Sequence, residues 1–519
     1  WVNIVRDVND MWLELLWAVG VAAGLVVILF HKARPRGKAH QTIPSNFQGG
    51  RPLGFEERMF LDSSDNGAMQ TSRVFILSSK MPLTRRIVHE SLVRLVAIHP
   101  LLRLKIAWHQ GEPWMVPAQD RQIYLEELQT KDWKLVVEQE LQVKFDSPSG
   151  RLWRVKFLPN FSYSQPSSTH PYQVALVLSL SHVITDGVGF IKMFNDLLTI
   201  LDDVVKGQET TIPIVDKLPP TLEECLGIEP ETGWMTVVKN NLLSWIISFQ
   251  CVRLLILKFL RNKFLEAFPP DQTKSSSSDI KTCLLTEEFP ESFTSKLLAA
   301  SRANKCTVTA AIHSAASYAI SKLWHQRGRK ESSVDIHSCL LYGFRNREIK
   351  GETASAKMGN YVTNIELHQN VKTQLVSTES FWQTARDIQA KFKDQIEKGR
   401  HIGLVKSTIT MQQIGFKFST LIKDVWKRPS KNGAVNLIFV VNNIGNCSYL
   451  ERPSDSAINL QACYQAISVH KIGPIFNNLL ITFKGKLFLT VVYCPYVVSE
   501  EVSKQYVANL KETLCTLME

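Results

Sequence analysis

The chain has 519 residues, of which 45% are hydrophobic and 21% charged, and its formal net charge is +12. This composition excludes an intrinsically disordered chain, and the length favours two or more domains. The charge suits an anionic membrane or a phosphate-bearing cosubstrate; no zinc-finger, RNA-recognition or basic-helix pattern is present, so we expect no nucleic-acid partner. The nine cysteines are odd in number and never spaced C-x-x-C, which is typical of neither a disulfide framework nor a zinc site.

The first feature along the chain is an apolar segment at residues 11–30, which contains a single charge, Glu14. Its length is sufficient for a helix that crosses a bilayer. The basic stretch HKARPRGK at residues 31–38 follows, without the cleavage site expected of a signal peptide, which is the alternative interpretation. We therefore expect residues 1–40 to form a membrane anchor and its basic flank, in a single-pass protein of the endoplasmic reticulum with its catalytic body in the cytosol.

Between residues 41 and 204, runs rich in β-branched residues alternate with amphipathic helical patterns. Pro100 ends the first of these helices. We predict a first domain over residues 41–204, with strands at 72–79, 153–158 and 172–180 and helices at 84–100 and 189–201.

Residues 205–279 are predicted to be an insertion. Within it, residues 234–268 are largely apolar, but basic side chains recur along one side too often for a clean membrane span. A helix lying in the membrane interface fits this pattern, and a helix packed on the domain is the alternative. The Ser-rich stretch DQTKSSSSD at residues 271–279 then reads as a linker.

The remaining chain, residues 280–519, again mixes helices and strands, and we predict a second domain there. Its expected strands are at 282–285 and 435–443, with a hairpin at 478–493, and its expected helices are at 307–323 and 500–518. The predicted fold class is therefore α/β or α+β in two domains, preceded by a transmembrane helix.

Candidate chemistry centres on SHVITDGVGF at residues 181–190, directly after an apolar strand. A histidine can serve as a general base near neutral pH, and a loop after a strand can present it to a cleft. Asp186 could hold this loop or orient the His182 ring, and Gly187 would tolerate a positive φ. On these residues alone, a structural histidine remains open. No H-x-x-H, H-E-x-x-H, G-x-S-x-G or phosphate-loop motif occurs, so we predict no metal and no serine nucleophile.

SHVITDG resembles the H-x-x-x-D-G motif of the acyltransferases related to chloramphenicol acetyltransferase. That superfamily includes peptide-synthetase condensation domains, BAHD enzymes, alcohol acetyltransferases and wax ester synthase/diacylglycerol acyltransferases. Further resemblances follow in the same order along the chain, from about residue 52 to the end and outside the insertion. They are AIHPLLR, TVTAAIHSAASYAI, FRNR with MGNYV, VVNNIGN and GKLFLTVVYCPYVVSEE.

The resemblance implies two chloramphenicol-acetyltransferase-like domains around a central tunnel, with His182 as general base. Asp186 would be structural, paired with Arg345 or Arg347, and together with Gly187 it would support the loop. Asn443 would donate a hydrogen bond to the developing oxyanion. The sequence does not identify the substrate-binding residues.

The implied activity is O-acyl transfer from acyl-CoA, a cosubstrate, to a lipid or other hydrophobic alcohol, with no bound cofactor. Ser181 stands where condensation domains and wax ester synthases carry a first histidine, and no D-F-G-W-G segment matches the BAHD enzymes. The closest branch is therefore the alcohol acetyltransferases. N-acylation on the same fold and a catalytically silent acyl- or lipid-binding protein are the alternatives.

Overall fold

The computed structural model describes residues 47–118, 122–165, 167–208, 215–228, 263–269, 281–329, 331–345, 347–349, 358–372, 377–413, 437–469 and 473–517. No helix within these ranges is long and apolar enough to cross a membrane. The longest of them, α12 (Thr378–Glu397), has 20 residues but is amphipathic and charged. The prediction of a single-pass membrane protein is therefore wrong for the described chain. The expected anchor at residues 11–30 and most of the expected interfacial helix at 234–268 lie outside the described residues.

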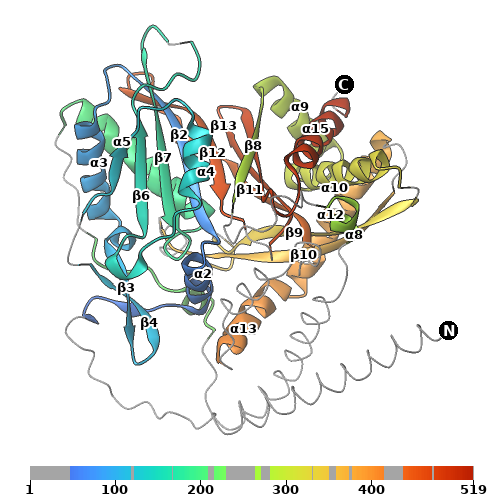
Figure 1. Ribbon diagram of the computed structural model, residues 1–519, viewed down its shortest axis with the longest axis horizontal. Coiled ribbons are helices and arrows are strands. Elements are labelled where there is room, and N and C mark those ends of the chain that lie inside the picture. Colours follow the sequence, from blue (N-terminus) through green and yellow to red (C-terminus); the bar gives the residue numbers. More distant parts are fainter. Residues whose placement is uncertain are drawn as a thin grey trace.

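The first half of the chain supplies four strands of a five-stranded sheet with the order β12-β2-β7-β6-β5 (Figure 1). Helices α3 (Arg85–Ile98) and α5 (Gly187–Val205) contact each other on one side of it, and α4 (Trp133–Glu140) packs against β2 and β7 on the other. Because the central strands β2 and β7 are covered on both faces, nearly all of their residues are buried, and their middle positions, 74–77 and 174–178, form continuous apolar runs. The strands are β2 (Gln70–Ser79), β5 (Leu125–Glu127), β6 (Trp153–Leu158), β7 (Tyr172–Ser181) and β12 (Ile458–Ile467).

The second half builds a six-stranded sheet with the order β10-β9-β11-β13-β14-β8. Its central helix, α10 (Val308–Gln326), contacts α12 and α15 (Glu500–Thr516) and is buried nearly all round, which its many small residues allow. Two further helices are α9 (Glu291–Ala303) and α13 (Arg400–Gln413). The strands are β8 (Cys283–Phe289), β9 (Ser333–Gly343), β10 (Val362–Lys372), β11 (Leu437–Asn446), β13 (Phe476–Phe483) and β14 (Lys486–Tyr493).

Shorter elements complete the described fold. A small sheet, β1-β4-β3, lies beside the first domain, and α2 lies between it and α13. These elements are β1 (Arg51–Pro52), α2 (Phe55–Asp65), η2 (Pro100–Arg103), β3 (Leu104–His109), β4 (Glu112–Pro117), η3 (Ser147–Ser149), α6 (Leu222–Cys225), α8 (Lys263–Ala267) and η6 (Ser448–Leu450).

Strand β12 joins the two halves. It lies late in the sequence, yet it pairs antiparallel with β2 in the first sheet, from Ile458 opposite Ser79 to Ile467 opposite Thr71. The buried apolar side chains nevertheless form two clusters, one around each sheet. The fold is thus a mixed α/β structure with two cores and an exchanged strand.

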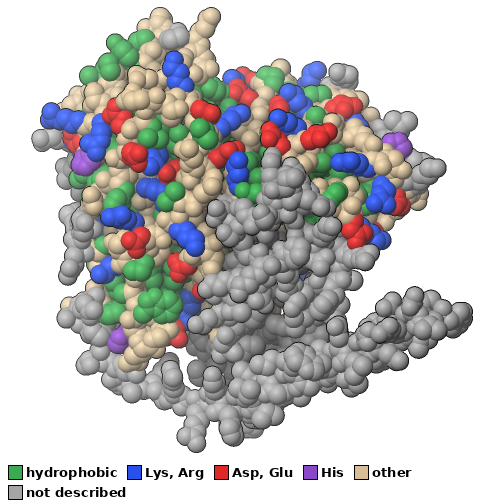
Figure 2. Space-filling model, in the orientation of Figure 1, with side chains coloured by type: hydrophobic (Ala, Val, Ile, Leu, Met, Phe, Trp, Pro, Cys, Tyr) green, Lys and Arg blue, Asp and Glu red, His purple; other side chains and the backbone are tan. Residues whose placement is uncertain are grey.

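Charge is not segregated on the face shown in Figure 2. Basic and acidic side chains are interspersed there over the described residues. The formal charge of +12 therefore does not form one continuous basic surface on this face, as a backbone-reading nucleic-acid interface would require.

Candidate active site

The H-x-x-x-D-G segment is a tight strand-to-helix connection. Strand β7 ends at Ser181 and α5 begins at Gly187. Asp186 caps this helix, because the backbone N–H of Gly189 donates to its Oδ1 at 2.6 Å. A carboxylate at this position satisfies an otherwise unpaired N–H and complements the helix dipole. The fold therefore fixes the backbone on both sides of His182.

The His182 ring is buried, with 8% of the residue exposed. It stacks on Phe60 of α2, with ring centroids 4.1 Å apart and planes at 7°. Burial lowers the pKa of His182 to about 4; a hydrogen bond to its own carbonyl and the charge of Asp186 act in the opposite direction, and the charge of Arg73 lowers it further. The imidazole is therefore uncharged at neutral pH.

Asn360 contacts both the ring and the backbone of His182. Its Nδ2 lies 3.0 Å from the His182 carbonyl oxygen and 3.1 Å from Nδ1. The other ring nitrogen, Nε2, takes part in neither contact.

The Asp186 carboxylate is committed to holding the loop. Its Oδ2 accepts from the Tyr361 N–H at 2.9 Å and from Arg345 Nε at 3.3 Å, and the ion pair is buried on both sides. The Asp186 N–H and Arg345 Nη2 both donate to the Gly359 carbonyl, at 3.0 and 3.1 Å. These bonds tie the His182 loop to the segment that follows residue 357.

Arg345 and Arg347 were both candidates for the partner of Asp186, and the structure separates them. Arg345 forms the ion pair, whereas the guanidinium of Arg347 lies over the Tyr342 ring at 4.5 Å.

Gly187 is needed for a different reason from the one expected. It is not among the residues with positive φ. A Cβ at this position would lie 2.5 Å from Ile444 Cδ1 and 3.2 Å from Arg73 Nη2. The Ile444 side chain on β11 would therefore have to shift before a Cβ could be placed here, and the expected role in a positive-φ turn is corrected.

Asn443, on β11, has both ends of its amide engaged. Its Nδ2 donates to Thr309 Oγ1 at 3.0 Å, and its Oδ1 accepts from the Gly445 N–H at 2.9 Å. The first of these bonds joins β11 to the first turn of α10, and the second lies within β11. An oxyanion role for Asn443 stays a prediction.

Three neighbours of the loop were not assigned from the sequence. Asn360 stands in the GN pair of the MGNYV segment, so a signal for it was present. Phe60 and Arg73 come from α2 and β2, and no motif marks them. Arg73 is 4% exposed. Its guanidinium lies 4.9 Å from the Phe190 ring, and its Nη1 has no hydrogen-bond partner within the described chain.

This arrangement has a counterpart among known proteins. Residues 126–457 match the family model described as alcohol acetyltransferase. The chain belongs to the alcohol acetyltransferase family. The expected kinship with the acyltransferases related to chloramphenicol acetyltransferase is thereby confirmed, and the chain is an acyltransferase that takes an acyl donor and an alcohol acceptor. No curated protein matches it in sequence.

Solved structures share the fold of this alcohol acetyltransferase family member at low sequence identity. The trichothecene 15-O-acetyltransferase TRI3 from Fusarium sporotrichioides superposes with a TM-score of 0.65 at 12% identity, covering 90% of this chain and 94% of that one. The first condensation domain of the calcium-dependent antibiotic synthetase has a TM-score of 0.57 at 10% identity, covering 91% and 97%. Polyketide synthase associated protein 5 from Mycobacterium tuberculosis has 0.56 at 14% identity, covering 90% and 97%. These likenesses show the fold alone.

Proposed function

We propose that this protein transfers an acyl group from acyl-CoA to the hydroxyl of an alcohol, with His182 as the general base. The observation that carries the proposal is a buried, uncharged imidazole at the end of a strand, held through Asn360. The neighbouring Asp186 carboxylate is occupied by Arg345 and by backbone N–H groups. Family membership supports the reaction class, and the net charge of +12 suits a donor that bears phosphates.

In the proposed reaction, His182 Nε2 takes the proton of the acceptor hydroxyl while the hydroxyl oxygen attacks the thioester carbonyl. The C–O bond forms, and the tetrahedral intermediate then collapses by breaking the C–S bond. The departing CoA thiolate receives the proton from the imidazolium. The products are the ester and free CoA, and no acyl group is carried on the protein.

The low pKa of His182 and the proposed role are compatible. A neutral ring is ready to accept a proton at any pH well above about 4. Once the proton has moved, the oxyanion of the tetrahedral intermediate is a nearby negative charge that stabilises the imidazolium. Burial thus keeps the base uncharged before the reaction, and charge pairing supports it during the reaction.

The surroundings of the ring support an apolar acceptor. Phe60 covers one face of the imidazole, with ring planes only 7° apart. An alcohol that approaches Nε2 therefore meets an aromatic wall, which favours an apolar carbon skeleton beside the reacting hydroxyl.

Purified protein incubated with acetyl-CoA or longer acyl-CoAs and a panel of alcohols tests this function. Free CoA is measured with a thiol reagent and the ester by mass spectrometry, and amine acceptors in the panel distinguish O- from N-acylation. We expect ester and CoA in equal amounts. His182→Ala should lower the rate by about 10²–10⁴-fold, the usual contribution of a general base.

His325→Ala is the matched control, because His325 lies at the exposed end of α10, away from the loop. It should retain the wild-type rate. Full activity of His182→Ala, with unchanged far-UV circular dichroism, would remove His182 from the mechanism.

A further inference from the structure

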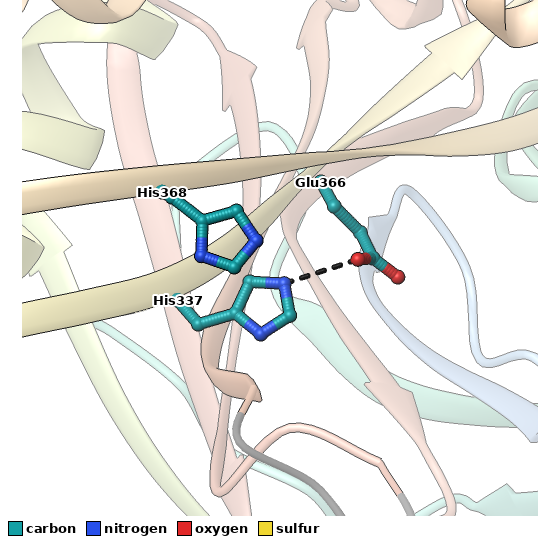
Figure 3. Close-up of side chains that lie close together, drawn as sticks. All are labelled: His337, Glu366 and His368. Carbon is teal, nitrogen blue, oxygen red and sulfur yellow. Dashed lines mark hydrogen bonds and ion pairs between the residues drawn. The ribbon is translucent and has the colours of Figure 1, made fainter. Parts of the chain in front are cut away.

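A cluster of metal-ligating side chains lies on the second sheet, outside the proposed active site. His337 comes from β9, and Glu366 and His368 come from β10 (Figure 3). One ligand atom from each residue can be chosen so that all lie within 4.8 Å of one another. The proposed reaction uses none of the three.

Strand register brings these residues together. His337 and His368 are direct cross-strand partners, and Glu366 lies two residues before His368 on the same strand. Since side chains alternate between the faces of a strand, all three stand on one face. The neighbouring positions of β10, Ile365 and Leu367, are buried on the opposite face. The cluster is therefore built on the open side of the sheet, on a backbone ladder that fixes its spacing.

The side chains are already partly arranged around one point. The two imidazole rings are stacked, with centroids 4.0 Å apart and planes at 16°, and His337 Nε2 lies 3.1 Å from Glu366 Oε2 (Figure 3). Two ligands of one tetrahedral Zn²⁺ lie about 3.4 Å apart, given bonds of about 2.0–2.1 Å. To bind one ion, the stacked rings must tilt so that one nitrogen of each points at it, which closes the present spacing of up to 4.8 Å to that value.

We propose that His337, Glu366 and His368 bind one divalent transition-metal ion, Zn²⁺ by preference, on the open face of the β9–β10 pair. Two imidazoles and a carboxylate are the donors that Zn²⁺ accepts, with water in the remaining position, whereas Mg²⁺ and Ca²⁺ prefer all-oxygen sites. The His337 side chain is only 16% exposed and contacts Glu366. The Glu366 side chain is half-exposed, so an ion could reach the cluster from solvent.

The ion would stabilise the sheet and would take no part in acyl transfer. β10 is the edge strand of the sheet, and a metal bridging it to β9 adds a link beyond the backbone ladder. His368 stands eight positions along the chain from Asn360, which at about 3.3 Å per residue is roughly 26 Å of extended strand. The sequence offers no local motif for this site because its ligands come from two strands whose pairing no linear spacing reveals.

The test uses the full chain without a polyhistidine tag, freed of metal with a chelator. Isothermal titration calorimetry with ZnCl₂ should give one binding event per chain, and Zn²⁺ but not Mg²⁺ should raise the thermal midpoint. Glu366→Gln and His368→Ala should each weaken Zn²⁺ binding by at least about 10-fold, since even the loss of an outer hydrogen-bond partner of a metal ligand costs about 10–100-fold. Both residues are exposed, so both variants should fold.

His325→Ala is again the control and should bind Zn²⁺ as the wild type does. Two results would overturn the proposal. One is the absence of a calorimetric signal at 100-fold excess of ZnCl₂ over a protein of confirmed fold. The other is equal binding by wild type and by a His337→Asn/His368→Ala double variant, which would place the ion elsewhere on the chain. Neither readout requires acyl transfer, so failure here is distinguishable from failure of the proposed function.

Discussion

Burial of His182 predicts that the activity of the proposed enzyme declines at an unusually low pH, on the acid limb of its profile of kcat/KM against pH. A base works only when unprotonated, and burial lowers the pKa of this ring to about 4 from an ordinary value of 6.5. As the pH falls, kcat/KM should therefore stay level through pH 6.5 and decline only as the pH approaches about 4. The measurement is kcat/KM against pH, with residual activity checked after return to neutral pH. A decline centred near pH 6.5 would mean that the reacting histidine is not this buried ring.

Arg73 also affects the pKa of His182. Its guanidinium lowers the pKa of His182, although less than burial does. Arg73→Met removes the charge and keeps an unbranched side chain, so the acid limb should move to higher pH. Arg85→Met, an exposed arginine at the start of α3, should leave the limb where it is. An unmoved limb in Arg73→Met would show that Arg73 does not act on the ring.

Asn360 is a positioning residue in this account. Asn360→Ala removes the contacts to the His182 carbonyl and to Nδ1. We expect kcat to fall about 10–100-fold with little change in KM, because removing one partner of a buried hydrogen bond costs about 1–3 kcal/mol and the contacts of Asn360 are to His182. Steady-state kinetics and a thermal melt check this together. A KM that rises as kcat stays constant would make Asn360 a substrate-binding residue instead.

The ion pair between Asp186 and Arg345 connects the start of α5 to the segment around Gly359. Asp186→Asn leaves Arg345 without its buried counter-charge, which should cost about 3–5 kcal/mol in the free energy of unfolding. Urea denaturation measures it. Glu397→Gln, in an exposed pair with Lys393, is the matched control and should change stability by less than about 1 kcal/mol.

The activity of Asp186→Asn then separates two roles for the carboxylate. If Asp186 only holds the loop, the folded variant should retain part of its activity at low temperature. A variant as stable as the wild type and as inactive as His182→Ala would mean that the carboxylate acts on the chemistry.

The contact between α5 and β11 predicts a rescue. In Gly187→Ala the new Cβ would meet Ile444 Cδ1 at 2.5 Å, so one of the two must move. We expect a loss of about 1–3 kcal/mol in the free energy of unfolding, typical of overpacking. Ile444→Val removes that methyl group and should restore part of the loss in the double variant. A strictly additive double variant would show that a different contact requires the glycine.

Across the whole chain, the sequence predicts individual helices and strands, but it does not predict which distant strands pair in the sheets. Expected strands at 72–79 and 153–158 are β2 and β6, and the expected helix at 307–323 is α10, because a continuous or alternating apolar stretch of the right length marks each of them locally. The pairing of β12 with β2 joins residues nearly 400 positions apart, from Ile467 to Thr71, and no periodicity encodes it.

The same distinction holds for the site. His182, Asp186 and Arg345 stand in motifs that resemblance to known acyltransferases makes visible, and the structure brings them into one loop and its support. Phe60 reaches the ring from α2, and Arg73 comes from β2, where no motif marks it. Only the packing of α2 and β2 brings these two residues to His182. The expectation of a membrane-spanning protein rested on hydropathy alone, and no described helix supports it.

Direct transfer requires that the His182 ring removes the acceptor proton and that no acyl group is carried on the chain. Single-turnover ester formation, followed by rapid quench and mass spectrometry, measures both in wild type and His182→Ala with saturating substrates. We expect a rate about 10²–10⁴-fold lower in the variant, and no acylated protein in either. Rates within about threefold of each other, or an acyl group found covalently on the chain before the ester appears, would contradict it.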